Sequence, residues 1–209
     1  MAETPLHREN MVATIDRLRV WYAGRTDVYI SGNMFVYYVE GDRRKHVSPD
    51  VMLILNVPAT YRDIYCTWLE PKHTLDLVFE FTSKSTSDED LIEKRQLYAA
   101  ELGVREYLLF DPYAEYLDPP EQMLRLVLGK YVPVKPVDGR LPSAVTGLHF
   151  ERDGNNLLLW DPATQAYVPT QAEWQEMRAD QLQAENARLL AEIAALRSGK
   201  QPDGSGRSD

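Results

Sequence analysis

The stretch that decides the fold is DLVFEFTSKSTSDEDLIEKRQLYAAELGVREYLLFDP, from Asp76 to Pro112. Leu75 to Phe81 is apolar and rich in strand-forming residues, which predicts a buried β-strand. A helical pattern then runs to about Leu102, where Gly103 supplies a stop signal. VREYLLF predicts a second strand, which ends before Pro112. Strand, helix and strand at this spacing predict a βαβ unit, and with it an α/β fold built on a parallel or mixed sheet.

The segment between the first strand and the helix is polar and cannot continue the strand. It runs from Ser83 to Asp88. Ser87 with Asp90, or Thr86 with Glu89, has the three-residue spacing of a capping box. The sequence therefore predicts that the helix begins in this segment.

Two carboxylates occupy unusual places in predicted strands. Glu80 lies in the middle of the strand LDLVFEF, and Asp50 follows Ser48-Pro49 at the start of the strand SPDVMLILNVP, which ends before Pro58. A buried carboxylate is costly unless it is paired or binds a cation. If the two strands are neighbours, the acids converge and repel each other unless a cation lies between them. Mg²⁺ is the cation that takes one or two carboxylates and retains several waters.

A lysine on the predicted helix can complete such a site. At 3.6 residues per turn, the apolar stripe follows Leu91, Tyr98 and Leu102, and Lys94 lies about 60° from Leu91. Lys94 therefore belongs to the flank that faces the sheet. Lys84, in the loop after the strand, is a second candidate. A cation at this place would stabilise the negative charge formed when a metal-bound water attacks a phosphodiester.

Each of these residues also has a purely structural interpretation. An acid at a strand end is commonly a turn or cap residue, and a lysine at the edge of an apolar stripe commonly extends its amine to solvent. Taken together, the order strand-Asp, strand-Glu, helix-Lys favours a catalytic site.

The remainder of the chain before residue 170 is rich in strands. A helix is predicted over about Glu9 to Tyr22, and a hairpin over VYISG and NMFVYYVE with its turn at Ser31-Gly32-Asn33. After Pro119-Pro120, QMLRLVL, KYVPV, LHFERDG and NNLLLWD predict strands that either extend the sheet or form a β-rich cap.

The C-terminal region has a heptad pattern. Leu182, Leu189 and Leu196 occupy position d, and Ala179, Asn186 and Ile193 occupy position a. Leucine at d with a single Asn at a is typical of a parallel two-stranded coiled coil and predicts a homodimer. The alternative is an amphipathic helix docked on its own domain. The predicted organisation is an α/β domain over 1–168, a coiled-coil helix over 170–197 and a disordered tail over 198–209.

Composition excludes several classes of protein. The net charge of the 209 residues is −9, so nucleic-acid binding would need a local basic patch. The cluster Arg43-Arg44-Lys45-His46 is short and more typical of a solvated loop. Cys66 is the only cysteine, which rules out an intrachain disulfide. We expect it to behave as a small apolar residue and not as a nucleophile. With no signal region and no membrane-spanning run, we expect a cytoplasmic protein without a membrane partner.

Four sequence motifs together resemble those of the Uma-two family of endonucleases, a branch of the PD-(D/E)XK nuclease superfamily. They are SPDVMLIL, LDLVFEFTSKST, DLIEKRQLY and GVREYLLFDP, which contain Asp50, Glu80, Lys94 and Asp111. The resemblance implies a restriction-endonuclease-like mixed β-sheet core flanked by helices, with Asp50 and Glu80 binding Mg²⁺ (or Mn²⁺). The superfamily's lysine usually follows the Glu by two residues. That position holds Thr82 here, and the resemblance implies that Lys94 has taken over the role.

Two functions are compatible with these residues. The first is a Mg²⁺-dependent endonuclease that hydrolyses DNA phosphodiester bonds, with Asp50, Glu80 and Lys94 as catalytic residues. The second is a catalytically inactive nuclease fold that serves as a dimerisation or interaction module, suggested by the acidic charge, Thr82 and the C-terminal heptads. A Ser or Cys hydrolase has little support, because no G-x-S-x-G motif is present, and no P-loop or dinucleotide glycine pattern is found.

Overall fold

A computed structural model describes residues 4–70, 74–82 and 89–198. The chain divides into two compact units, Met1–Thr170 and Gln171–Asp209. Among the described residues, no helix has a stretch long and apolar enough to span a membrane.

A six-stranded mixed sheet forms the centre of the first unit. Its order is β1-β4-β6-β7-β8-β9, in which β6 and β7 are parallel and the other neighbours are antiparallel. The strands are β1 (Val28–Ser31), β4 (Val51–Leu55), β6 (Leu77–Phe81), β7 (Glu106–Phe110), β8 (Glu121–Val127) and β9 (Lys130–Pro133). The parallel pair confirms the predicted βαβ unit, and β8 and β9 confirm the predicted extension of the sheet.

One face of this sheet is covered by α1 (Pro5–Trp21) and a four-stranded antiparallel sheet. Leu18 of α1, Phe79 of β6 and Phe150 of the smaller sheet share one apolar core. The smaller sheet comprises β10 (Leu141–Pro142), β11 (His149–Asp153), β12 (Asn156–Asp161) and β13 (Ala166–Tyr167). The chain after residue 140 therefore supplies the β-rich cap that the sequence left as an alternative.

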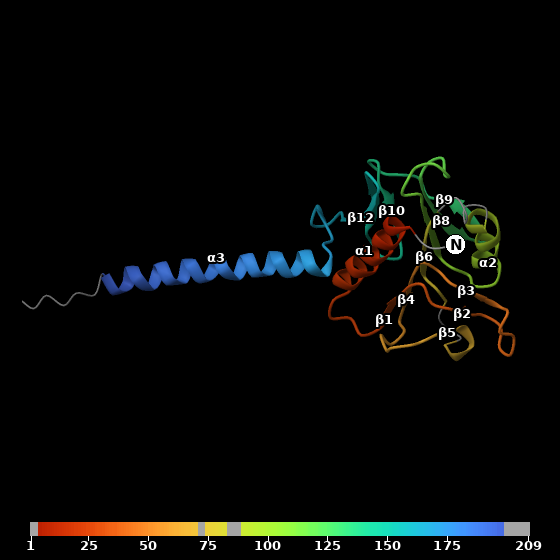
Figure 1. The fold of residues 1–209 in the computed structure, drawn as a ribbon, viewed down its shortest axis with the longest axis horizontal. Coiled ribbons are helices and arrows are strands. Elements are labelled where there is room, and N and C mark those ends of the chain that lie inside the picture. The colour runs from red at the N-terminus through yellow and green to blue at the C-terminus, as the bar shows by residue number, and fades with distance from the viewer. Residues whose placement is uncertain (1–3, 71–73, 83–88, 199–209) are drawn as a thin grey trace, which may run out of the picture. The chain divides into compact units, whose positions relative to one another are not determined.

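The other face packs against α2 (Arg95–Ala100) and a three-stranded sheet. Tyr98 of α2 and Val36 of the small sheet belong to this second core. The small sheet has the order β3-β2-β5, with β3 at His46–Val47, β2 at Val36–Tyr37 and β5 at Tyr65–Cys66; the 3₁₀ helix η1 (Thr67–Leu69) follows. Figure 1 shows α1 and α2 on opposite sides of β6.

The predicted hairpin is wrong. β1 pairs with β4, whereas β2 pairs with β3 and β5. The turn residues do redirect the chain, since Asn33 has φ +50°. They dock it against the start of β4, where Asn33 N donates to Pro49 O at 2.8 Å. A side chain on Gly32 would meet the carbonyl oxygen of Asp50 at 2.0 Å, so only glycine fits this approach.

The helix of the βαβ unit differs in form from the prediction. A π-helical segment, η2 (Glu89–Lys94), leads into α2, and Gly103 follows with φ +59°, the left-handed conformation predicted for the stop. The predicted capping residues Thr86 and Ser87 lie outside the described residues, as does Lys84.

The second unit contains α3 (Gln171–Ser198). The leucines at the heptad d positions and Ile193 are 45 to 67% exposed. The predicted tail lies outside the described residues beyond Ser198.

Candidate active site

Glu80 is buried in the second core and contacts α2 directly. Its side chain is 1% exposed. The Lys94 ammonium Nζ donates to Glu80 Oε2 at 2.9 Å, and the Tyr98 hydroxyl donates to Oε1 at 2.6 Å. The lysine compensates the charge of the buried carboxylate, and the short hydroxyl contact fixes its orientation.

The helical period explains why both partners reach the same carboxylate. Lys94 and Tyr98 are four residues apart and therefore lie on one face of the helix. The Tyr98 ring packs edge-on against Tyr107 of β7 at 5.1 Å, which anchors this face to the sheet. The prediction that Lys94 faces the sheet is confirmed. The contact between Tyr98 and Glu80 was not predicted, although the i, i+4 spacing of Lys94 and Tyr98 could have indicated it.

Asp50 lies one residue before β4, beside Glu80. The antiparallel register pairs Val51 with Phe79, so continuing it by one residue places Asp50 next to Glu80. The Phe81 amide donates to Asp50 Oδ2 at 2.8 Å. The carboxylate of Asp50 thus receives an amide of the neighbouring strand, immediately after the residue that carries the other acid.

His7 supports Asp50 from the other face of the sheet. Its Nε2 lies 3.2 Å from Asp50 Oδ1, and its ring packs edge-on against Phe81 at 5.9 Å. The sequence pattern does not indicate this residue, because it predicts a helix that begins only near Glu9. The helix begins at Pro5, with Thr4 as its cap accepting from the His7 amide at 3.2 Å.

The two carboxylates fit a divalent cation through their chemistry. A carboxylate carries about four lone-pair positions, so one group can accept hydrogen bonds and also ligate a cation. Oxygen ligands suit Mg²⁺, which needs only one or two carboxylates and completes its shell with water. Among the residues that the structure describes, no group of three or more His, Cys, Asp or Glu side chains converges on such a site.

Thr82 occupies the place of the superfamily's usual lysine. It is 2% exposed and lies two residues after Glu80, on the same face of the strand. Its amide donates to Phe110 O at 2.8 Å, so it extends the pairing of β6 with β7. The ammonium group beside Glu80 comes from Lys94 instead.

A cavity of about 500 Å³ opens beside Lys94. It lies between the helix and the small three-stranded sheet, and Ser48, two residues before Asp50, belongs to its wall. Its other lining residues are Phe35, Tyr38, His46, Val47, Glu93 and Leu97. The basic loop Arg43-Arg44-Lys45 precedes His46, and Arg44 pairs with Asp42 with its side chain 89% exposed.

Cys66 is separate from this site. It lines a different cavity of about 310 Å³ with residues such as Tyr37 and Trp68. Burial raises the pKa of the Cys66 thiol, which makes the thiolate scarcer at neutral pH and disfavours a role as nucleophile.

The arrangement is a mixed sheet flanked by helices, with acids directly before β4 and within the neighbouring strand β6, and a lysine on the helical segment that connects β6 to β7. A solved structure from Anabaena variabilis ATCC 29413, described as a "putative nuclease belonging to DUF820", has the same fold, with a TM-score of 0.50, 12% identity, and coverage of 70% of this chain and 76% of that one. The family model described as "Putative restriction endonuclease" matches residues 1–152. The chain belongs to this family, Uma2. No curated protein matches it.

Removing the Tyr98 hydroxyl should destabilise the fold. Tyr98→Phe retains the ring but takes one donor from the buried Glu80 carboxylate, which should lower the free energy of unfolding by about 1.5–3 kcal/mol. Tyr131→Phe is the matched control, because Tyr131 OH donates at 2.9 Å to the uncharged carbonyl of Val104; we expect a loss of about 0.5–1.5 kcal/mol. Urea unfolding measures both. Equal losses would mean that the charged contact contributes nothing extra.

Proposed function

We propose that the protein is a metal-dependent endonuclease that hydrolyses phosphodiester bonds of DNA. The observation that carries the proposal is the set Asp50, Glu80 and Lys94: two acids from adjacent strands, with an ammonium group 2.9 Å from Glu80. Family membership supports a nuclease, because the family is described as a restriction endonuclease. The proposal adds two points to this description: that the substrate is DNA and that cleavage requires a divalent metal.

Asp50 and Glu80 are the residues that would hold Mg²⁺ or Mn²⁺. When bound, the cation would lower the pKa of a water and offset charge on the phosphate. The residues around the acids keep them in place: His7 and the Phe81 amide restrain Asp50, while Tyr98 restrains Glu80. Such support limits the reorganisation needed during the reaction.

Lys94 has two tasks in this proposal. It compensates the charge of the buried Glu80 carboxylate through their ion pair. With substrate present, its ammonium orients the attacking water and stabilises negative charge on the scissile phosphate. Since its side chain is 14% exposed and lines the cavity of about 500 Å³, it can contact both the buried acid and a ligand in the cavity.

Cleavage of DNA tests the proposed function. Supercoiled plasmid and labelled oligonucleotides are incubated with the full-length protein in Mg²⁺, Mn²⁺ or EDTA. We expect nicked or linear products with either cation and none in EDTA, because the two carboxylates alone supply no activated water. Absence of products under all cation conditions, for single- and double-stranded DNA, would contradict the proposal.

We also propose that residues 170–197 form a parallel coiled coil that joins two copies of the chain, each with an endonuclease domain over residues 1–168. The support is the exposed heptad face of α3, with Asn186 at a central a position. A parallel pair would place two nuclease domains on the same side of the dimer. We expect this dimer to work in the cytoplasm.

The alternative function is a catalytically inactive interaction module. Thr82 in place of the usual lysine is the observation that favours it. The ammonium of Lys94 beside Glu80 favours the enzyme instead. A stable dimer that cleaves no DNA would support the module.

A further inference from the structure

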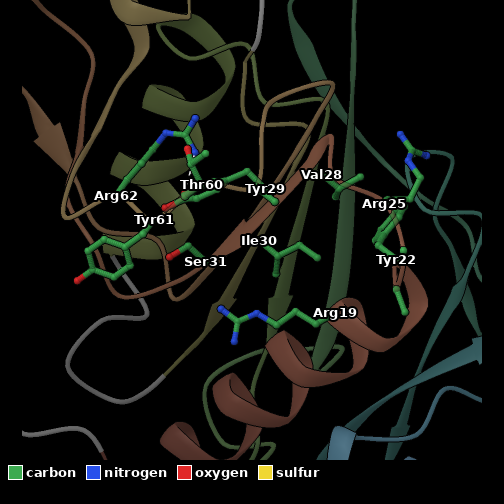
Figure 2. Close-up of a pocket in the computed structure, with 13 residues that line it drawn as sticks. Arg19, Tyr22, Arg25, Val28, Tyr29, Ile30, Ser31, Thr60, Tyr61 and Arg62 are labelled. Atoms are coloured by element: carbon green, nitrogen blue, oxygen red, sulfur yellow. Dashed lines mark hydrogen bonds between the residues drawn. The ribbon is translucent and has the colours of Figure 1, made fainter.

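A further cavity, of about 530 Å³, runs along β1, an edge strand of the central sheet. Its walls come from the end of α1, from β1 and from the loop after β4. Figure 2 shows Tyr22 and Arg25 at the Val28 end of this strand and Tyr61 towards the Ser31 end. The cavity shares no lining residue with the one beside Lys94.

The charged residues that line this cavity are all arginines: Arg19, Arg25 and Arg62. Two of them are held in place, since Arg25 pairs with Asp27 at 2.6 Å and Arg62 with Glu70 at 2.5 Å. Arg19 is exposed and forms no ion pair within the described part of the chain. In a protein of net charge −9, this is a local site with cationic donors for an anion.

Three tyrosines, Tyr22, Tyr29 and Tyr61, line the same cavity as these arginines. The Arg62 guanidinium lies over the Tyr29 ring at 4.5 Å, and that of Arg25 lies 5.9 Å from the centre of the Tyr22 ring. Tyr61 is 91% exposed, so its ring is available for stacking. Arginines for phosphates, combined with an exposed aromatic face for a base, are the means by which proteins bind unpaired nucleic-acid strands.

The cavity adjoins the candidate active site through the backbone. Ser31 lines its end, and the next residue, Gly32, packs directly on the Asp50 carbonyl. The Ser31 end of the cavity therefore lies one residue along the chain from the contact with Asp50, which carries one of the two candidate carboxylates. Because β1 is an edge strand of the sheet, it also offers unpaired backbone donors along the cavity.

We infer that this cavity is a nucleotide-binding subsite that takes a phosphate and base of an unpaired nucleic-acid strand next to the cleaved bond. The inference deepens the proposed function and rests on it. The same chemistry would suit a free nucleotide, and the experiment below separates the two sources.

The test is fluorescence anisotropy of a labelled single-stranded oligothymidylate with the full-length protein in EDTA, where no cleavage interferes. Arg19→Glu should weaken binding at least about tenfold and reduce the salt dependence by about one phosphate contact. Tyr61→Ala should weaken it about tenfold through lost stacking. The control is Lys130→Glu, an exposed cation beside the turn of β9 at the opposite edge of the sheet, with an expected change below about twofold.

Equal weakening by Arg19→Glu and Lys130→Glu, or no binding by the wild type, would overturn the inference. Circular dichroism verifies the fold, and Arg19→Gln provides a milder second variant. If thymidine monophosphate displaces the strand from the wild type with an affinity similar to that of the oligonucleotide, and Arg19→Glu abolishes this, the ligand is the free nucleotide. Binding needs no metal, so a protein that binds through Arg19 but cleaves nothing would contradict the proposed function and leave the subsite standing.

Discussion

Replacing Glu80 with Gln should abolish DNA cleavage and eliminate or strongly weaken the binding of Mg²⁺. We expect the cleavage rate to fall by at least about a hundredfold, comparable to the loss of one preorganised electrostatic group in an active site. The side chain keeps its size, so the second core stays filled. Its charge is lost, and with it a proposed cation ligand and the ion pair with Lys94.

The stability of this variant should change less than its activity. The Tyr98 hydroxyl can still donate to the amide oxygen at the position of Oε1. Lys94 loses its carboxylate, but its side chain lines an open cavity and can turn toward water. We therefore expect a loss of about 1.5–3 kcal/mol in the free energy of unfolding, the range for the lost hydrogen bond between charged groups.

Calorimetric titration of Mg²⁺ or Mn²⁺ separates metal binding from catalysis. Wild type, Asp50→Asn and Glu80→Gln are compared, and circular dichroism checks that all three are folded. Glu101→Gln, an exposed acid at the end of α2, is the matched control and should behave as wild type. Binding by wild type and control alone would support a shared carboxylate site.

Equal metal binding by wild type, Asp50→Asn and Glu80→Gln would contradict the proposed site. Any cation bound equally by all three proteins would lie away from these two carboxylates, and the ion pair between Lys94 and Glu80 would then be structural. The fold would be retained without its chemistry, as expected for the interaction module.

The local βαβ unit was predictable because its signals are short in range. β6, α2 and β7 follow from apolar runs, a helical period and a glycine stop within about 35 residues of the sequence. The pairing of β1 with β4 was not predictable. A turn between two strand-like runs suggests a hairpin, whereas the partner that a strand takes depends on tertiary packing. Here the absence of a side chain at Gly32 lets the chain dock on Asp50, which directs β1 to β4.

In the candidate site, too, short-range signals were predictable and contacts that depend on tertiary packing were not. The helical period alone could place Lys94 on the flank of the helix that faces the sheet. His7 could not be placed beside Asp50, because the two are far apart in sequence and the contact depends on the packing of α1 across the sheet. Sequence patterns thus identify residues that share an element with the catalytic groups, but they do not reveal support that arrives from a distant element.

A charge in the apolar face of α3 should convert the proposed dimer into monomers. Leu189 lies at the d position nearest to Asn186 and is 46% exposed in the single chain. Leu189→Asp would place two carboxylates against each other in the seam of a parallel coil, where like charges repel and lose hydration. With only about three heptads, such a coil has little stability to spare.

Sedimentation equilibrium on the full-length protein measures this effect. Wild type should have twice the mass of one chain, and Leu189→Asp the mass of one. Ala191→Asp is the control: it adds the same charge at position f, which faces away from the seam, and should remain dimeric.

Two results would contradict the coiled coil. If Leu189→Asp remains dimeric, the interface lies elsewhere in the chain. If wild type is monomeric and Leu189→Asp lowers its melting temperature, the apolar face of α3 packs on its own domain, as in the alternative interpretation of the heptads.

Dissociation by Leu189→Asp with unchanged cleavage of single-stranded DNA, but loss of double-strand breaks, would show that the coil serves to bring two active sites to one duplex.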